Sequence, residues 1–501
     1  MLAGPREKAM TQTADAAVQT GGTPTSPELT RRAVRGAVWM VAGHGGAQVL
    51  RLGGNLVLTR VLAREHFGLM ALVMVVLYAV NLLSDLGIGP AIVQSKHGDD
   101  PTYVDTAWTI QVVRGLVLGA ITCLLAWPAA AFYGDPRLTE LVLVAALVPI
   151  ISGSESANRH LQSRHLALGR LVLLDLVSQV GSLVVMLTWA LLWPSALALV
   201  IGALTRQLVY TILTHLALPG TRSRFCWDRD AARSVARFGR WILLSTALTF
   251  LAGYSDRAIF GKLVTLSQLG IYAIALVIAA APQEAIDRLN GAVIFPLFSR
   301  AAQRGDDLQK MYLKARWPVL IVGSWALAGV IAGGPTGVRI LYDERYWDAG
   351  SMVQILAAGL WFGIVLAGTN GAVLLAHGRP YWLAGGSAAK FLGLLIGIPL
   401  GFKWGGILGA IAGLSAAEGC RYLVITYAVR RAGFRIGKQD AVVTLQLVAG
   451  AGVGLLAANT TRRYGLPIAA EALAVFLAVT ALWLPHLPAL RGWRAWRAAD
   501  S

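Results

Sequence analysis

Long apolar stretches separated by short polar loops dominate the chain. Fourteen of these stretches, each of roughly 18–25 residues, are long enough to cross the ~30 Å hydrocarbon layer of a bilayer as an α-helix. They lie near 34–58, 66–93, 104–127, 138–156, 168–192, 196–217, 238–262, 267–292, 315–334, 350–375, 381–401, 405–429, 440–458 and 466–485. The pattern predicts an all-α membrane protein with about 14 transmembrane helices.

Lysine and arginine residues are concentrated in every second loop between these stretches. The richer set of loops holds roughly three times as many basic residues as the other set, and it includes the strongly basic loop at 219–235. Basic loops tend to stay on the cytoplasmic side of a membrane. The asymmetry therefore predicts an even number of crossings, with both the N and C termini in the cytoplasm.

Composition supports a membrane chain and argues against other classes. Hydrophobic residues make up 56% of the sequence and charged residues 14%, against ~45–50% and ~25% in soluble domains. The net charge of +18 is scattered over loops instead of forming one basic face, so no nucleic-acid partner is expected. Cys123, Cys226 and Cys420 have no spacing typical of a metal site or disulfide framework, so no metal is expected.

Two parts of the chain align when one is shifted by 202 residues. Because six crossings separate the aligned first and seventh segments, these run in the same direction, as in the parallel repeats of transporters. The matched positions include Arg35 with Arg237, Trp39 with Trp241, Gly68 with Gly270, and Asp85 with Asp287. The expected divisions are a disordered cytoplasmic tail at 1–30, a six-helix N-terminal lobe at 31–218, a cytoplasmic inter-lobe loop at 219–235, a pseudo-symmetric six-helix C-terminal lobe at 236–430, and two further helices with a cytoplasmic tail at 431–501.

Four short stretches carry a family resemblance: LTRVLAREHFGLMAL, SDLGIGPAIVQ, YSDRAIFGKLVTLSQLGIYAIA and FPLFSR. Together they resemble the Wzx-type lipopolysaccharide and exopolysaccharide flippases of the multidrug/oligosaccharidyl-lipid/polysaccharide (MOP) exporter superfamily, most clearly over residues 31–300. The resemblance implies a two-lobed carrier in a bacterial plasma (inner) membrane. Its substrate would be an undecaprenyl-pyrophosphate-linked oligosaccharide for O-antigen, capsule or exopolysaccharide, and its partners would include the bilayer and the polymerase and chain-length regulator of the same pathway.

Ionisable residues inside the apolar segments are predominantly basic. A charge at the centre of a membrane helix costs at least ~2.5–3.5 kcal/mol, so such residues normally face a partner or a water-filled cavity. The basic ones are Arg51, Arg114, Arg206, Arg257, Lys390 and Arg421, and the acidic ones are Asp175, Asp256 and Glu418. The basic surplus predicts a central cationic cavity that binds an anion, and the resemblance to the flippases implies transport by alternating access.

The first segment presents a polar stripe because His44, Gln48, Arg51 and Asn55 are spaced four, three and four residues apart. This stripe either faces the cavity or makes hydrogen bonds between helices. Asn55 aligns with Arg257 in the repeat, and arginine suits the oxygens of a pyrophosphate. The expected substrate-binding residues are Gln48, Arg51, Asn55, Arg114, Arg206, Arg257 and Lys390.

Other polar positions are expected to have structural or gating roles. Asp256 should hold Arg257 or its helix in place, and Glu418 and Arg421 are spaced to form an ion pair on one helix. Four glycines from Gly401 to Gly413 recur every four residues, which predicts a close contact between helices. Near the inner ends of the second and eighth segments, the candidates for structure or gating are Asp85, Glu284, Asp287 and Arg288.

Two other functions remain alternatives. One is a MATE-like drug antiporter or a peptidoglycan-precursor flippase of the same superfamily, although a cation exporter favours a surplus of membrane acids. The other is a membrane enzyme of glycan assembly, although the longest expected outer loop, 335–349, is too short for a catalytic domain. The sequence contains no G-x-x-x-x-G-K-[ST] motif for ATP, so neither a cofactor nor a catalytic residue is expected.

Overall fold

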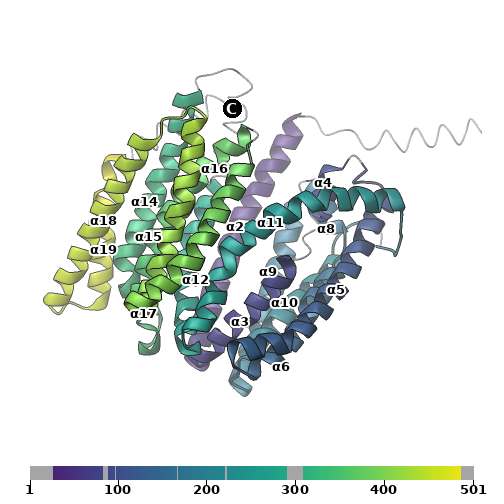
Figure 1. The fold of residues 1–501 in the computed structure, drawn as a ribbon, viewed down its shortest axis with the longest axis horizontal. Coiled ribbons are helices and arrows are strands. Elements are labelled where there is room, and N and C mark those ends of the chain that lie inside the picture. Colours follow the sequence, from purple (N-terminus) through teal and green to yellow (C-terminus); the bar gives the residue numbers. More distant parts are fainter. Residues whose placement is uncertain are drawn as a thin grey trace, which may run out of the picture.

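The computed structural model describes residues 26–82, 88–95, 97–165, 167–220, 223–289, 308–377 and 379–486. Across these ranges every regular element is a helix, and none of them contains a β-strand. The helices form two groups that meet at one end of the molecule and diverge toward the other (Figure 1). The chain is therefore an all-helical, multi-pass membrane protein, as the apolar pattern predicts.

The first group begins with a long helix and continues through several shorter ones. Its helix α5 shows how local sequence sets the boundaries, because the Asp100 side chain caps the first turn and Gly134 ends the helix in the left-handed conformation at φ 77°. The members are α2 (Ser26–Val61), α3 (Arg64–Leu82), α4 (Ile88–Gln94), α5 (Pro101–Tyr133), α6 (Arg137–Ala145), α7 (Leu147–Gly153), α8 (Asn158–Arg164), α9 (Leu168–Leu192) and α10 (Leu197–Leu216).

The second group begins with α11, which is 35 residues long and is capped by Asp228 through the amides of Asp230 and Ala231. It includes one π-helical stretch, η3. The members are α11 (Arg229–Leu263), α12 (Leu266–Leu289), α14 (Leu308–Leu341), η2 (Glu344–Tyr346), α15 (Ala349–Leu360), η3 (Trp361–Leu366), α16 (Ala367–Ala376), α17 (Tyr381–Arg431), α18 (Gly437–Arg463), α19 (Ile468–Ala481) and η4 (Leu484–His486).

In the described ranges nine helices are long and apolar enough to cross a membrane. A bent pair, Arg137–Gly153 with Asn158–Arg164, raises this to as many as ten, and Ile468–Ala481 is apolar but shorter. The 51-residue α17 contains non-helical backbone at Gly405 and Gly406, and the expected segments 381–401 and 405–429 fall largely on either side of that break. The number of about fourteen crossings stays a prediction.

The break folds α17 into a hairpin whose two arms are in close contact. Gly401 lies against the backbone of Gly409, and Gly397 lies against the backbone of Gly413. A Cβ at any of these positions would overlap a carbonyl group of the other arm. The predicted close contact is confirmed for Gly401, Gly409 and Gly413, where it joins two arms of one hairpin, whereas Gly405 lies in the break itself.

The two groups of helices touch where α3 crosses α12, and the first turns of α11 also pack against α4 and α5 of the first group. Gly68 lies against the backbone of Leu266, and Gly270 lies against the backbone of Arg64. Any side chain at either glycine would overlap a carbonyl oxygen of the other helix. The two contacts are reciprocal, because residues 64 and 68 align with 266 and 270 at the offset of 202.

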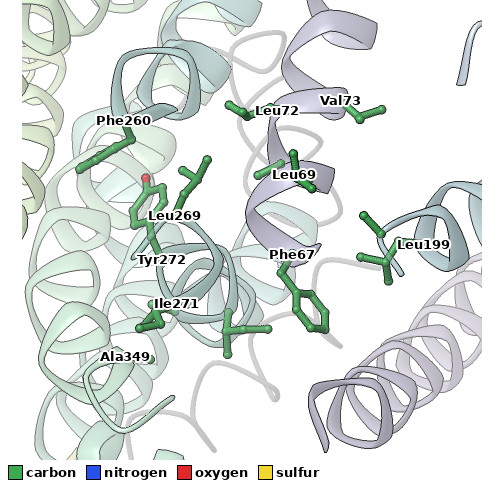
Figure 2. Close-up of a cluster of buried hydrophobic side chains, with 14 of the residues drawn as sticks. Phe67, Leu69, Leu72, Val73, Leu199, Phe260, Leu269, Ile271, Tyr272 and Ala349 are labelled. Atoms are coloured by element: carbon green, nitrogen blue, oxygen red, sulfur yellow. The ribbon is translucent and has the colours of Figure 1, made fainter. Parts of the chain in front are cut away.

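A buried apolar cluster lies beside this crossing and includes side chains from both groups. Phe67 and Leu69 come from α3, Phe260 comes from α11, and Leu269 and Tyr272 come from α12 (Figure 2). Phe260, Leu269 and Tyr272 have no solvent exposure. Between membrane helices such side chains contribute through van der Waals packing, so this end of the molecule is held by a continuous core.

Polar contacts join the two groups at the same end. Arg345 of η2 donates to the carbonyl of Thr59 at 2.8 Å, and Arg64 donates to the carbonyl of Arg345 at 3.0 Å. Lys262 of α11 donates to the carbonyl of Phe132, at the end of α5, at 2.6 Å. We call this the closed end of the molecule. The predicted orientation places it on the outer side of the membrane.

A buried ion pair fastens α18 to the second group. Arg316 of α14 lies 2.8 Å from Asp440 of α18, and both side chains are almost fully buried. Arg316 also donates to Thr369, and the Tyr422 hydroxyl donates to the other oxygen of Asp440. The network connects α14, α16, α17 and α18, so α18 belongs to the same packed unit as the second group.

Candidate functional site

A cavity of about 830 Å³ lies between the two groups of helices. Side chains of α2, α3, α9 and α10 line it from the first group, and side chains of α11, α12, α15, η3 and α17 line it from the second. Leu58, Phe67 and Leu199 belong both to this wall and to the buried cluster. The cavity therefore ends on the core at the closed end.

The α2 wall contains three of the predicted polar residues. Gln48, Arg51 and Asn55 line the cavity because their spacing of three and four residues places them on one face of the helix. Arg51 is exposed, and Gln48 has a buried Oε1 that accepts no hydrogen bond within the described part of the chain. These three residues lie where the sequence predicted them, and the side chain of His44 lies outside the described residues.

The α11 wall contains Asp256 and Arg257 side by side. Asp256 is buried and accepts a 2.5 Å hydrogen bond from the hydroxyl of Tyr272 on α12. Arg257 lies 3.7 Å from Asp256, donates to the carbonyl of Gly253 at 3.4 Å, and lies 5.2 Å from the ring centroid of Tyr254. Tyr272 binds one carboxylate oxygen, and the guanidinium forms a long ion pair with the other, which accepts no hydrogen bond within the described ranges.

The α17 wall contains an ion pair between the two arms of the hairpin. Lys390 lies 2.5 Å from Glu418, and their side chains are 15% and 5% exposed. The carboxylate also lies against the backbone of Gly363 in the π-helical stretch η3. The predicted pairing of Glu418 with Arg421 is therefore wrong, because a lysine on the facing arm approaches the carboxylate more closely.

Two further predicted binding residues lie outside the wall of the central cavity. Arg114 lines a second cavity of about 330 Å³ between α3, α4, α5, α7 and α8. Arg206 of α10 forms a 2.5 Å ion pair with Asp175 of α9. Asp175 lies on the same face of α9 as Gln179 and Ser182, which line the central cavity. The Asp175 pair lies about one turn further from the closed end than Gln179.

Four of the five residues predicted to be structural or gating cannot be placed in this geometry, Asp256 being the exception. Asp85 lies outside the described residues. Glu284, Asp287 and Arg288 belong to α12, but their side chains lie outside the described residues as well. The roles assigned to these four residues stay predictions.

Sequence reasoning missed several groups on the cavity wall. Arg421 lines the cavity, and its buried Nε has no hydrogen-bond partner within the described ranges. Tyr78 of α3 and Tyr254 of α11 stack at a ring distance of 3.8 Å and join the two groups of helices along the wall. A tyrosine in an apolar segment needs a partner for its hydroxyl, and that signal could have identified Tyr272 as the partner of Asp256.

The charge of the cavity wall favours an anion. Its described ionisable side chains are the basic Arg51, Arg257, Lys390 and Arg421 and the acidic Asp256 and Glu418. Two positive charges remain after both carboxylates are counted against them. In the described part of the chain, no cluster of His, Cys, Asp and Glu side chains could hold a metal ion.

Solved structures with the same fold are membrane transporters. The structure titled lipid II flippase MurJ, in an inward closed conformation, matches with a TM-score of 0.70 at 10% identity, over 89% of this chain and 97% of that one. An inward-facing multidrug-resistance MATE transporter of the MOP superfamily matches with a TM-score of 0.59 at 13% identity, over 79% of this chain and 95% of that one. At these identities the matches establish the fold alone.

Curated relatives come from polysaccharide pathways. The lipopolysaccharide biosynthesis protein WzxC of Escherichia coli (strain K12) is 22% identical over 70% of this chain and 71% of its own length. The succinoglycan biosynthesis transport protein ExoT of Rhizobium meliloti (strain 1021) is 23% identical over 66% and 67%. The amylovoran biosynthesis protein AmsL of Erwinia amylovora is 24% identical over 55% and 73%.

These relatives confirm the resemblance to the polysaccharide flippases that the sequence motifs indicate. The family model described as polysaccharide biosynthesis protein matches residues 57–350, which is more than half of the chain. The chain belongs to the polysaccharide biosynthesis protein family.

Proposed function

We propose that this protein is a flippase that carries lipid-linked oligosaccharide repeat units across the bacterial plasma membrane. The substrate would be an undecaprenyl-pyrophosphate-linked oligosaccharide for lipopolysaccharide O-antigen, capsule or exopolysaccharide. The observation that carries the proposal is the cationic cavity between the two groups of helices, in a chain of a polysaccharide family. A pyrophosphate diester has two negative charges, which match the excess of two positive charges on the wall.

Arg257 is the residue best placed to bind the pyrophosphate. Its side chain is 25% exposed in the cavity wall, and the hydroxyl of Tyr272 donates to one oxygen of the neighbouring carboxylate. Arg51 on α2 is exposed in the same cavity. Arginine donates two parallel hydrogen bonds to phosphate oxygens, so one residue from each group of helices would contact the anion. Gln48, Asn55, Lys390 and Arg421 would complete the binding surface.

Transport would proceed by alternating access between two six-helix lobes. The reciprocal contacts of Gly68 and Gly270 support a pseudo-symmetric pivot, because equivalent residues of the two halves meet there. The lobes would be residues 31–218 and 236–430, joined by 219–235 and followed by two helices in 431–501. In this conformation the closed end would face outward and the cavity would open toward the cytoplasm.

The orientation has a direct test in cysteine labelling of sealed cells. Single cysteines placed in 335–349 or 459–465 should react with a membrane-impermeant reagent added outside. Cysteines placed in 219–235 or 300–312 should react after the cells are opened. Labelling of the 219–235 loop from outside intact cells would invert the orientation.

The activity is tested by locating the lipid-linked unit in cells that lack the protein. We expect such cells to synthesise the unit, to retain it on the cytoplasmic leaflet and to lose the surface glycan, which depends downstream on the polymerase and chain-length regulator. A wild-type gene should restore the glycan. If the deletion abolished synthesis of the unit, or left monomeric units already exposed outside, an enzyme of glycan assembly would be the better assignment.

A flippase for the peptidoglycan precursor is the second candidate, because the fold matches that of the lipid II flippase MurJ. The two candidates differ in the effect of losing the protein. A peptidoglycan flippase would be required for growth. If this chain had that function, it would also restore growth to cells depleted of their own peptidoglycan-precursor flippase. We expect no rescue, with growth retained and surface glycan lost. A MATE-like antiporter of cationic drugs fits the basic surplus of the cavity less well.

A further inference from the structure

The chain between α10 and α11 is tied along one side of α5. Residues 223–228 form no helix or strand, yet three alternate backbone amides in this stretch donate to α5 side chains. The amide of Arg224 donates to Asp105 at 3.1 Å, that of Cys226 to Thr109 at 3.0 Å, and that of Asp228 to Thr106 at 3.2 Å. Alternation of this kind is typical of an extended chain, so the segment is fixed although it has no regular structure.

Two large aromatic side chains project from this fixed segment. Phe225 is 71% exposed and Trp227 is 64% exposed, and their spacing of two places them on the same side of an extended chain. The ring of Phe225 rests on Trp108 at a centroid distance of 4.9 Å, and Trp108 is itself held by a hydrogen bond to the carbonyl of Glu155. The backbone is anchored, so these rings are presented outward in a defined position.

The segment lies on the side of α5 that faces lipid. Asp105 and Thr109 share a helical face with Val113, Leu116 and Leu124, because the positions are separated by three, four or eight residues. Those three apolar side chains are all exposed, as expected for residues in contact with acyl chains. The linker therefore covers the continuation of a lipid-facing stripe.

The height of the segment along α5 corresponds to the headgroup layer. Positions 105–109 precede Val113 by four to eight residues, or roughly 6–12 Å at the rise of an α-helix. A headgroup layer is roughly 5–8 Å thick on each side of the hydrocarbon core. Trp is enriched at this boundary, Phe is common on the apolar face of interfacial segments, and arginines beside them reach lipid phosphates. Arg224 and Arg229 are both exposed next to the two rings.

We infer that residues 223–229 form a membrane-interface anchor. Phe225 and Trp227 insert between phospholipid headgroups and acyl chains of the leaflet nearest the start of α5, and Arg224 and Arg229 bind lipid phosphate. The inference is independent of the transported substrate. It gives the linker between the two halves, and the start of α11 that packs on α4 and α5, a fixed depth in the membrane.

The anchor is tested by measuring the depth of a fluorophore in purified protein in phospholipid nanodiscs. Cys123, Cys226 and Cys420 are replaced by alanine, and an environment-sensitive probe is attached to Phe225→Cys or Trp227→Cys. The matched control is Asp230→Cys, at a nearby position whose side chain is 91% exposed. We expect lipids carrying a nitroxide at the headgroup or upper acyl chain to quench the first two probes, with iodide quenching about threefold weaker than at position 230.

Equal iodide quenching at positions 225, 227 and 230 would overturn the anchor. Probes that are shielded in native membranes but exposed in nanodiscs would also overturn it, because they would indicate that a protein partner covers the segment. The melting temperature of each labelled variant shows whether it is folded.

The arginines are tested by retention of phosphatidylglycerol over phosphatidylcholine on the purified protein. Arg224→Gln and Arg229→Gln should each lower it roughly fivefold, and Arg233→Gln should not; equal retention in all three would overturn the phosphate contacts.

Discussion

The cavity has two sites where a basic side chain lies beside a buried carboxylate, and the carboxylates are held differently. On α11, one oxygen of Asp256 accepts a 2.5 Å bond from Tyr272; the other accepts no hydrogen bond within the described ranges and lies 3.7 Å from Arg257. On α17, Glu418 lies 2.5 Å from Lys390, and its second oxygen accepts no hydrogen bond within the described ranges. The arginine is thus the more distant of two groups beside its carboxylate, after a tyrosine that binds one oxygen, whereas the lysine is in close contact with its carboxylate.

This difference separates a binding role from a structural one. A buried carboxylate that loses its sole close partner destabilises the fold strongly. Lys390 and Glu418 are in that position, so removing one of them should lower stability before it reveals any effect on transport. Asp256 retains Tyr272 when Arg257 is removed, so Arg257 can be exchanged with a smaller loss of stability. We therefore assign anion binding primarily to Arg257 and Arg51, and Lys390 primarily to the hairpin.

The largest effect is expected for Glu418→Ala. It leaves the Lys390 ammonium without its carboxylate in a mostly buried position, which costs about 3–5 kcal/mol. We expect the amount of protein in membranes to fall severely and the melting temperature to drop. The double variant Lys390→Met with Glu418→Met removes both charges and should recover most of the abundance. Normal abundance of Glu418→Ala with loss of glycan export would instead assign this pair to transport.

Arg257→Ala should reduce export with little loss of protein. A charge-assisted contact contributes about 1.5–3 kcal/mol, so we expect surface glycan to be formed about tenfold to a hundredfold more slowly at near-normal abundance. Arg257→Lys should restore part of the activity, because it keeps the charge without the planar fork. Arg233→Ala is the control, since Arg233 lies on the same helix and is 68% exposed.

A different result would contradict the binding role of Arg257. In that result, the amount of the Arg257→Ala protein falls in step with export, and the double variant Arg257→Ala with Asp256→Ala recovers both. In that case the pair stabilises the fold as an ion pair, and Arg257 does not bind the anion.

The helices and the polar stripe could be predicted from the sequence because they depend on spacing within one segment. Gln48, Arg51 and Asn55 share a face by helical periodicity alone, and they line the cavity. The equivalence of Gly68 and Gly270 was also accessible, because they align in the repeat, and the structure places them in reciprocal contacts.

Contacts between different helices could not be predicted in the same way. Glu418 was assigned to Arg421 by its spacing of three, but the turn at Gly405 and Gly406 brings Lys390 of the other arm to the carboxylate. Arg114 was grouped with the cavity arginines because it is an intramembrane charge, yet its face of α5 lines a different cavity. Such assignments depend on the rotation of each helix in the bundle, which hydropathy does not determine.

Arg421→Gln should have a smaller effect on export than Arg257→Ala. Arg421 lines the cavity and forms no ion pair with a carboxylate in the described ranges. Its loss therefore removes one favourable charge and leaves the ion pair between Glu418 and Lys390 in place. We expect normal abundance and a reduction in glycan export of up to about tenfold, for a contact of about 1.5 kcal/mol. Loss of protein comparable to that of Glu418→Ala would show that Arg421 shares in holding the carboxylate.

The smallest effect is expected for Tyr272→Phe, which tests the comparison most directly. The change removes one hydroxyl and leaves the ring of Tyr272 in the buried cluster (Figure 2). Asp256 then lacks its 2.5 Å donor, and the nearest replacement is the guanidinium of Arg257, 3.7 Å away. Movement of Arg257 toward Asp256 would offset part of the loss, so we expect destabilisation of only about 1 kcal/mol.

The same movement would withdraw Arg257 from the substrate, so export by Tyr272→Phe should fall several-fold at near-normal abundance. Adding Asp256→Asn to Tyr272→Phe removes the charge that attracts Arg257 and should restore export, while Asp256→Asn alone should change it little. Export that stays low in the double variant would show that the tyrosine hydroxyl acts on transport by itself. Restored export would show that the hydroxyl is what keeps Arg257 available to an anion, which is the feature that distinguishes the α11 site from the α17 site.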